Sequence, residues 1–222
     1  MLSNIRIMKN TITNKRRIFE IVAVTFTAVG KFLFMDFLDL RLPYVVVAVI
    51  GWSFYIIVRS RQQKGILSYW GFRKDNFIKT VSLLGPFALG SILIFLIIGA
   101  YQGTINFTWH ILPILITYPL WGVIQQFLII GLVSGNLHDL ERPKINKYLI
   151  VLFSAFIFSI VHYPSTWLMI GIFLLALFYG FVYLRIRNIY ALGIFHGWLG
   201  AFFYYTVVGT DPFQDAFLVW IQ

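Results

Sequence analysis

Three groups of polar residues interrupt the apolar stretches of this sequence, and they are its candidates for chemistry. Gln125 and Gln126 are adjacent, His162 follows Phe158 by four residues, and His196 lies in a glycine-rich run. Inside hydrocarbon a polar side chain needs a partner, so such residues are candidates for function. An imidazole can move a proton near neutral pH, and a primary amide can hold an oxygen by donating hydrogen bonds.

Two of these groups also have a structural interpretation that the sequence leaves open. Adjacent residues on a helix point about 100° apart, so at least one of Gln125 and Gln126 is expected to face the protein interior. There it can simply hydrogen-bond two helices together. His162 comes just before Pro164, which ends a helix. A histidine near a helix end can equally have an interfacial role.

His196 has neighbours that favour a functional interpretation. Gly193, Gly197 and Gly200 form a small-residue face, which lets a second helix approach closely. His196 lies beside that face. It is therefore placed to meet either glutamine or the other histidine.

The elements that position these residues are predicted to be membrane-spanning helices. The composition is 59% hydrophobic and only 12% charged, with a mean hydropathy of +0.82. A soluble domain usually carries about 25% charged residues because it must cover its surface. The sequence therefore predicts an all-α, polytopic transmembrane helix bundle whose main partner is the lipid bilayer.

Apolar stretches long enough to cross a bilayer recur along the chain. About seven spans are expected, within a range of six to eight, and residues 1–222 are expected to form a single membrane domain. Its N-terminal spans and cytoplasmic loop occupy 1–105, and its core occupies 106–210. The spans are predicted near 19–38, 43–58, 78–101, 110–133, 148–163, 167–184 and 189–208.

Lysine and arginine are distributed asymmetrically between these spans. Five precede the first span, six lie in 59–79, three in 142–147 and two in 185–187, so 16 of the 18 fall on one side. The positive-inside rule then predicts a cytoplasmic N-terminus, in a multi-pass protein of the cell (inner, cytoplasmic) membrane. The same asymmetry explains the net charge of +10 without nucleic acid, so no nucleic-acid partner is predicted.

Cysteine is absent from the sequence, which excludes disulfides, thiol nucleophiles and cysteine-ligated metals. Two histidines with amide neighbours make a poor zinc site, because zinc usually has at least three His, Cys or carboxylate ligands. We therefore predict no metal and no cofactor.

The order of the three polar groups resembles the CAAX protease and bacteriocin-processing (CPBP) family of membrane proteins. That family has Glu-Glu-x-x-x-Arg on one helix, Phe-x-x-x-His on the next and His-x-x-x-Asn on a later one. Phe158–His162 matches the second motif, and the run 182–196 leading to His196 is similar to the approach to the third. The resemblance covers roughly residues 110–205.

The departures from that pattern are chemical. Gln125 and Gln126 occupy the positions of the paired glutamates, Ile130 that of the arginine, and Gly200 that of the asparagine. In intact members, the resemblance implies, a glutamate and a histidine activate water to attack a peptide carbonyl. The later His and Asn stabilise the oxyanion. A neutral amide cannot accept a proton, so the glutamate-based mechanism cannot operate here as it stands.

No other acid lies within the last four predicted spans, and Asp139 and Glu141 are expected in a basic loop. One atypical mechanism remains, in which His162 or His196 is the base and a glutamine amide holds the carbonyl oxygen. The catalytic candidates are therefore the two histidines and the two glutamines. The candidates for lining a substrate cavity are Phe158, Trp121 and Gly200.

Three functions follow as hypotheses. The first is a CPBP-type intramembrane peptidase with an atypical His/Gln site. The second is a catalytically silent relative that binds or protects a membrane-embedded or lipidated peptide or protein, as a scaffold or in self-immunity. The third is a small transporter, against which stands the lack of charged residues and broken-helix repeats in the last four spans.

Overall fold

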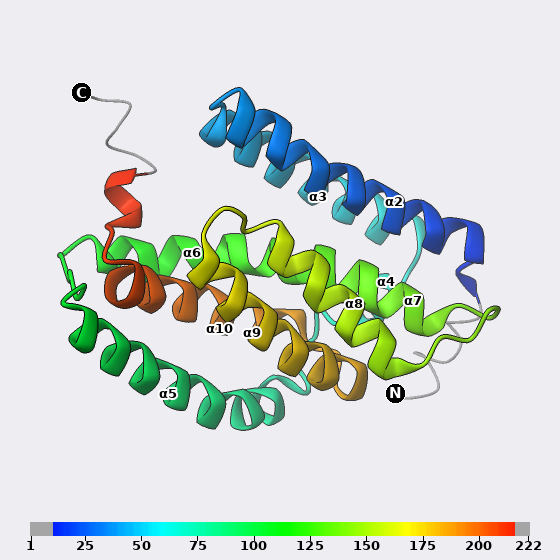
Figure 1. Ribbon diagram of the computed structural model, residues 1–222. Coiled ribbons are helices and arrows are strands. Elements are labelled where there is room, and N and C mark those ends of the chain that lie inside the picture. Colours follow the sequence, from blue (N-terminus) through cyan, green and yellow to red (C-terminus); the bar gives the residue numbers. More distant parts are fainter. Residues whose placement is uncertain (1–10, 216–222) are drawn as a thin grey trace. The chain divides into compact units, whose positions relative to one another are not determined.

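A computed structural model describes residues 11–215, and within that range every regular element is helical. The predicted all-α fold is therefore confirmed (Figure 1). The outer ends of the predicted membrane domain, 1–10 and 216–222, lie outside the described residues. Three elements, named η, are π-helices. The order is α2 (Asn14–Lys31), η1 (Phe32–Phe37), α3 (Arg41–Gln62), α4 (Ile66–Trp70), α5 (Phe77–Gln102), α6 (Ile111–Gln126), η2 (Phe127–Ser134), α7 (Gly135–Asp139), α8 (Lys147–Ile160), α9 (Thr166–Arg185), α10 (Ile189–Phe203) and η3 (Tyr204–Val208).

Each of the seven predicted spans corresponds to a helix. Among the described residues, six helices are long and apolar enough to cross a membrane: Asn14–Phe37, Arg41–Gln62, Phe77–Gln102, Ile111–Asp139, Thr166–Arg185 and Ile189–Val208. The remaining helix, Lys147–Ile160, has 14 residues. At about 1.5 Å per residue it is roughly 21 Å long, shorter than a typical bilayer core. The chain is a multi-pass membrane protein.

The chain folds into two compact units that are interleaved in sequence. Within the described range, the first unit joins residues 11–74 to Gln126–Ile189, and the second joins Asp75–Gln125 to residues 190–215. The boundary falls between Gln125 and Gln126, so the two adjacent glutamines belong to different units.

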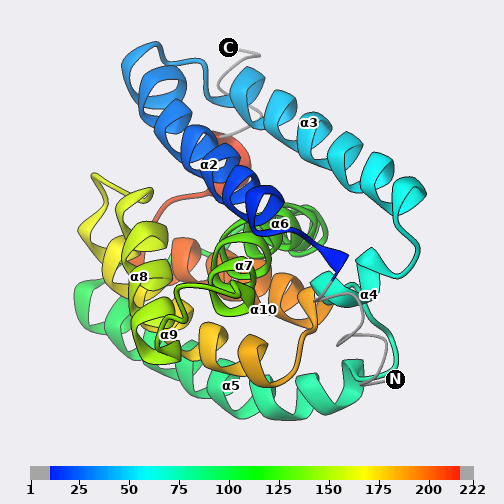
Figure 2. The same ribbon diagram turned by 90° about the vertical axis from the view of Figure 1, so that its right-hand side faces the viewer.

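In the first unit, α2 and α3 form a helical hairpin, and α8 packs along α9 (Figures 1 and 2). All eight residues of η2 are buried. Phe127, its first residue, lies in an aromatic cluster, with ring centroids 5.0 Å from Trp70, 5.3 Å from Phe72 and 6.4 Å from Trp52. These contacts join α3 and α4 to the start of η2.

Asp139 corrects one expectation from the sequence. We expected the fourth span to end near residue 133 and Asp139 to lie in a basic loop, but the helical segment continues to Asp139, which is 2% exposed. The Arg187 guanidinium and the Tyr69 hydroxyl each donate to its Oδ2 over 2.6 Å. Arg17 pairs with the same oxygen at 4.0 Å. Burial of this carboxylate is tolerated because two cations and a hydroxyl compensate it.

The second unit is built around a close approach of α6 and α10. A Cβ added at Gly193 would lie 2.4 Å from Val123 Cα, and one at Gly197 would lie 2.4 Å from Pro119 N. Any side chain at either position would collide with backbone, so the helices depend on glycine there. Gly200 differs, because its added Cβ would meet only Tyr118 Cδ2 at an ordinary 3.8 Å.

Candidate functional site

The α6–α10 seam places Gln125 and His196 side by side. His196 Nε2 lies 3.0 Å from Gln125 Oε1, and His196 is 6% exposed. An amide oxygen can only accept a hydrogen bond, so Nε2 of the neutral ring carries the proton. The basic lone pair of His196 is then on Nδ1. In this pairing Nε2 is a donor, and it is not available to take a proton from water.

Gln126 lies in the first unit and is fully buried. Neither its Oε1 nor its Nε2 has a hydrogen-bond partner among the described residues. A buried amide without partners carries a desolvation cost of about 1–3 kcal/mol. It also immediately precedes the π-helix η2, and π-helical segments are frequent at functional sites. Gln126 is thus a buried polar group whose hydrogen-bonding capacity is not used within residues 11–215.

His162 lies in the turn after α8, outside the helical spans. Its Nδ1 is 2.8 Å from the Phe158 carbonyl oxygen, and the two rings form an edge contact at 5.3 Å. A carbonyl accepts, so Nδ1 carries the proton and Nε2 holds the lone pair. Burial lowers the pKa of His162 to about 4; the bond to Phe158 opposes this and the Lys31 charge adds to it. His162 is therefore neutral at pH 7 and a weak base.

The other predicted site residues occupy different surroundings. Phe158 is 1% exposed and packs in the first unit, while Trp121 on α6 and Gly200 on α10 are half-buried in the second. Gln126 and His162 share a unit but no hydrogen bond. A cavity of about 440 Å³ adjoins the turn that contains His162, lined by Ser159, Tyr163 and residues of α9. Within residues 11–215, no three His, Asp or Glu side chains gather as metal ligands would.

Sequence reasoning missed a polar network in the first unit. Glu20, 2% exposed, accepts hydrogen bonds from Tyr55 and, over 2.7 Å, from Asn136 Nδ2. Asn136 also accepts from the buried Arg17, which pairs with Asp139. From the sequence we predicted no role for the charged residues in and before the first apolar stretch. The signal was the spacing of Arg17 and Glu20, one helical turn apart on one face.

The second unit also contains a polar cluster around Asp211, which lies beyond the end of the last span. Asp211 accepts from Thr108 at 2.7 Å and from Tyr205 at 2.9 Å, and it lies 2.6 Å from His110 Nδ1. Burial alone would raise the pKa of Asp211, but the hydrogen bonds from Thr108, His110 and Tyr205 lower it to about 2. The cluster fastens the segment after η3 to the loop before α6.

Comparison with known proteins points to one family. The family model described as type II CAAX prenyl endopeptidase Rce1-like matches residues 105–202, slightly less than half of the chain. The matched region contains all three polar groups, including Gln125, His162 and His196. No curated protein and no solved structure shows significant similarity to the chain. Residues 105–202 are thus similar to the type II CAAX prenyl endopeptidase Rce1-like family, in agreement with the resemblance that the polar motifs of this region carry.

Proposed function

We propose that this membrane protein retains the CAAX-protease-like scaffold but no longer hydrolyses peptides by the glutamate mechanism. Instead it binds or protects a membrane-embedded or lipidated peptide or protein. The observation that carries the proposal is the pairing of His196 Nε2 with the amide oxygen of Gln125 at 3.0 Å. That contact makes the ring nitrogen a donor, and the amide cannot take up a proton. A pair of this kind can hold a carbonyl or amide group of a bound peptide.

The low basicity of His162 supports the same conclusion. A general base works best with a pKa near the operating pH, whereas burial lowers the pKa of His162 to about 4. In the tautomer of His162 described above, the lone pair is on Nε2 and could accept a proton. The low pKa means that the ring would bind that proton only weakly.

A binding experiment tests this proposal. The full chain, purified in detergent, is titrated with a fluorescent farnesylated peptide that ends in a CAAX sequence, and fluorescence anisotropy is recorded. Binding of intact peptide supports the proposal, with weaker binding to Gln125→Ala and His196→Ala, the two members of the pair. The absence of binding to the folded wild type contradicts it. The His110→Ala variant, altered in the Asp211 cluster, is the control for nonspecific effects.

One observation favours a second candidate, an atypical peptidase. The Gln126 amide is buried and has no hydrogen-bond partner among the described residues. Such an amide is a donor of the kind that stabilises oxyanions, and His162 of the same unit is the candidate base. This candidate predicts cleavage of the peptide, which mass spectrometry of the same binding samples detects.

We further propose that the N-terminus is cytoplasmic and that the protein resides in the cell (inner) membrane, because Lys and Arg concentrate in the four segments described above. The sequence has no cysteine. Labelling of a single introduced cysteine therefore shows on which side of the membrane that residue lies. Ser68→Cys, before α5, should resist a membrane-impermeant maleimide in intact cells. Gln102→Cys, at the other end of α5, should react. The reverse pattern contradicts the orientation.

A further inference from the structure

The open end of the α2–α3 hairpin holds a polar cavity rich in positive charge. This cavity of about 410 Å³ is lined by Arg16 at the start of α2 and by Arg59 near the end of α3, with Thr11, Thr13, Gln62 and Gln63. The N-terminus of α2 adds the positive end of its helix dipole. Cationic side chains at a helix N-terminus favour an anion such as phosphate.

Arg59 is held in place in this cavity, and one of the hydrogen-bond donors of its guanidinium is unused among the described residues. It is 8% exposed, and its guanidinium donates to Gln62 Oε1 at 3.1 Å and to Gln63 Oε1 at 2.7 Å. Gln63 is held in turn by Thr11 at 3.0 Å. Among the described residues, the Nε of Arg59 has no hydrogen-bond partner. A buried N–H without a partner, on a side chain lining a cavity, points to a ligand that accepts from it.

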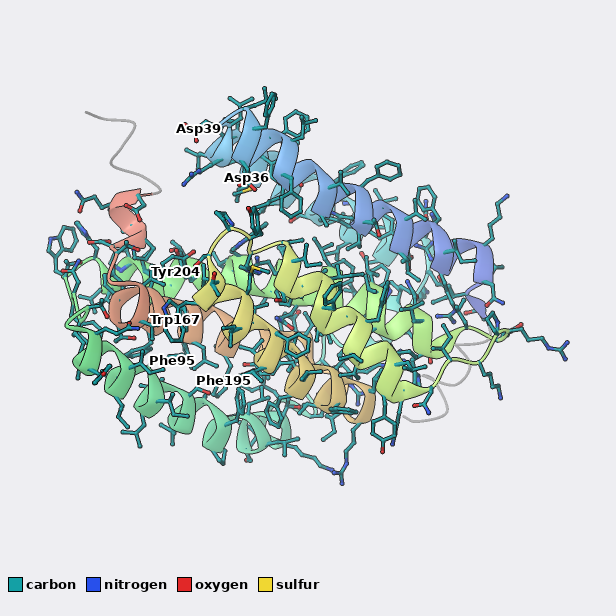
Figure 3. All side chains as sticks on the ribbon, in the orientation of Figure 1. Asp36, Asp39, Phe95, Trp167, Phe195 and Tyr204 are labelled. Carbon is teal, nitrogen blue, oxygen red and sulfur yellow. The ribbon has the colours of Figure 1, made fainter. Side chains whose placement is uncertain are left out.

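A second cavity lies further along the same hairpin. It measures about 340 Å³ and is lined on α2 by Phe19, Ala23 and Thr27, and on α3 by Val47, Ala48 and Gly51. Phe19 follows Arg16 by less than one turn, and the Arg16 guanidinium lies 5.8 Å from the Phe19 ring centroid. Phe19 is 57% exposed and Val47 69% exposed, so the cavity opens sideways on the surface that faces lipid. Asp36 and Asp39 lie at the opposite, closed end of the hairpin (Figure 3).

Glu20 and Tyr55 line the groove between its polar and apolar ends. Both carboxylate oxygens of Glu20 are engaged, one by Tyr55 and the other by Asn136. The carboxylate repels a second anion, which confines a phosphate to the Arg16 and Arg59 end. An uncharged chain meets no such repulsion further along the groove.

From these contacts we propose that the α2–α3 hairpin binds an anionic phospholipid from the bilayer. Its phosphate lies against Arg16, Arg59 and the N-terminus of α2. One acyl chain lies in the apolar groove between Phe19 and Thr27 of α2 and Val47 and Tyr55 of α3. Along the hairpin the cations Arg16 and Arg59 come first, the anion Glu20 next and the apolar groove last. This order places the lipid headgroup at the cationic end and the acyl chain in the groove. This site is separate from the residues of the proposed peptide function.

Native mass spectrometry of the detergent-solubilised full chain tests the proposal with dioleoyl phosphatidylglycerol and dioleoyl phosphatidylcholine. We expect one phosphatidylglycerol to be retained in preference to phosphatidylcholine. Arg16→Gln should weaken that retention about fivefold, the effect expected for one cation at an anionic lipid surface. The matched control is Arg61→Gln, an exposed arginine at the same end of α3, which should bind as the wild type does.

A second variant tests the acyl groove without touching the arginines. A Cβ added at Gly51 meets no atom within 4 Å, so Gly51→Leu fills the groove without disturbing backbone. Retention of phosphatidylglycerol should fall at least about fivefold, since a chain of several methylenes loses its contacts. Gly85→Leu on α5 is the control, because its Cβ also enters open space.

Three results would overturn the proposal. The first is equal retention of the two lipids by the wild type. The second is wild-type retention by both Arg16→Gln and Gly51→Leu. The third is displacement of phosphatidylglycerol by millimolar inorganic phosphate, which would show a site for free phosphate with no lipid chain.

Discussion

Gln125 Oε1 accepts a hydrogen bond from His196 Nε2 at 3.0 Å, in the second unit of the chain. The pair joins α6 to α10 at a position where the family pattern has a glutamate. The amide is neutral and cannot accept a proton. The contact therefore orients the imidazole of His196, but Gln125 cannot act as a proton acceptor in the way a glutamate would. A single atom, nitrogen in place of oxygen in the side chain at 125, separates this arrangement from a carboxylate–histidine pair.

The first prediction restores the missing acids. The variant Gln125→Glu, Gln126→Glu, Gly200→Asn should cleave a farnesylated CAAX peptide at least about 100-fold faster than the wild type, since general acid–base catalysis contributes roughly 10²–10⁴-fold. A Cβ added at Gly200 meets only Tyr118 Cδ2, at an ordinary 3.8 Å. Liquid chromatography with mass spectrometry measures the released tripeptide. The control is Gln125→Asn with Gln126→Asn, which adds no acid. Equal rates in the two variants would show that the missing carboxylates are not what limits cleavage.

The second prediction concerns the α6–α10 seam. Gly197→Leu should destabilise the protein by several kcal/mol, because its Cβ would lie 2.4 Å from the backbone nitrogen of Pro119. Gly200→Ala, one turn further along α10, should change stability by less than about 1 kcal/mol because its contact is an ordinary 3.8 Å. Thermal unfolding in detergent compares them. Equal melting temperatures would contradict the close packing.

The third prediction is a loss of stability in acid from His162. Its pKa falls from 6.5 to about 4 on folding, so between these values the unfolded chain binds more protons than the folded one. The stability from the neutral ring is complete above pH 6.5 and declines as the pH falls towards 4. Melting temperatures at pH 7.5 and pH 5 should differ less in His162→Gln, which has no titrating ring. An unchanged difference would mean that other groups dominate.

The fourth prediction removes the buried acid of the first unit. Asp139→Asn removes the negative charge that pairs with Arg17 and Arg187, and Arg17 is fully buried. Breaking a buried ion pair on one side costs about 3–5 kcal/mol, so the melting temperature should fall steeply. Glu141→Gln, an exposed acid two residues on, should have almost no effect. Comparable effects of the two substitutions would place Asp139 in solvent.

The sequence predicted the helices well because hydropathy is a local property. A run of about 20 apolar residues specifies a span without knowledge of its neighbours, and Gly193 and Gly197 indicated a close seam by type and spacing alone. Asp139 could not be placed in this way. Its burial depends on Arg17 and Arg187, which come from distant parts of the sequence, and a local pattern treats an acid as the end of a span.

The candidate site was only partly accessible to sequence reasoning for a related reason. The residue types at 125, 126, 162 and 196 indicated where chemistry is possible. Which ring nitrogen carries the proton depends on the atom opposite it, namely the Gln125 amide for His196 and the Phe158 carbonyl for His162. The engagement of Glu20 by Tyr55 and Asn136 likewise needs the fold, because those partners lie on other helices.

The most direct measurement is peptide cleavage by the purified wild-type chain. A farnesylated CAAX peptide is incubated with the full protein in detergent at pH 7, and the released tripeptide is quantified by mass spectrometry beside His162→Ala and His196→Ala. The wild type should bind the peptide and release no more tripeptide than either variant. Release by the wild type that disappears in both variants would contradict the proposal that the chain binds the peptide without cutting it.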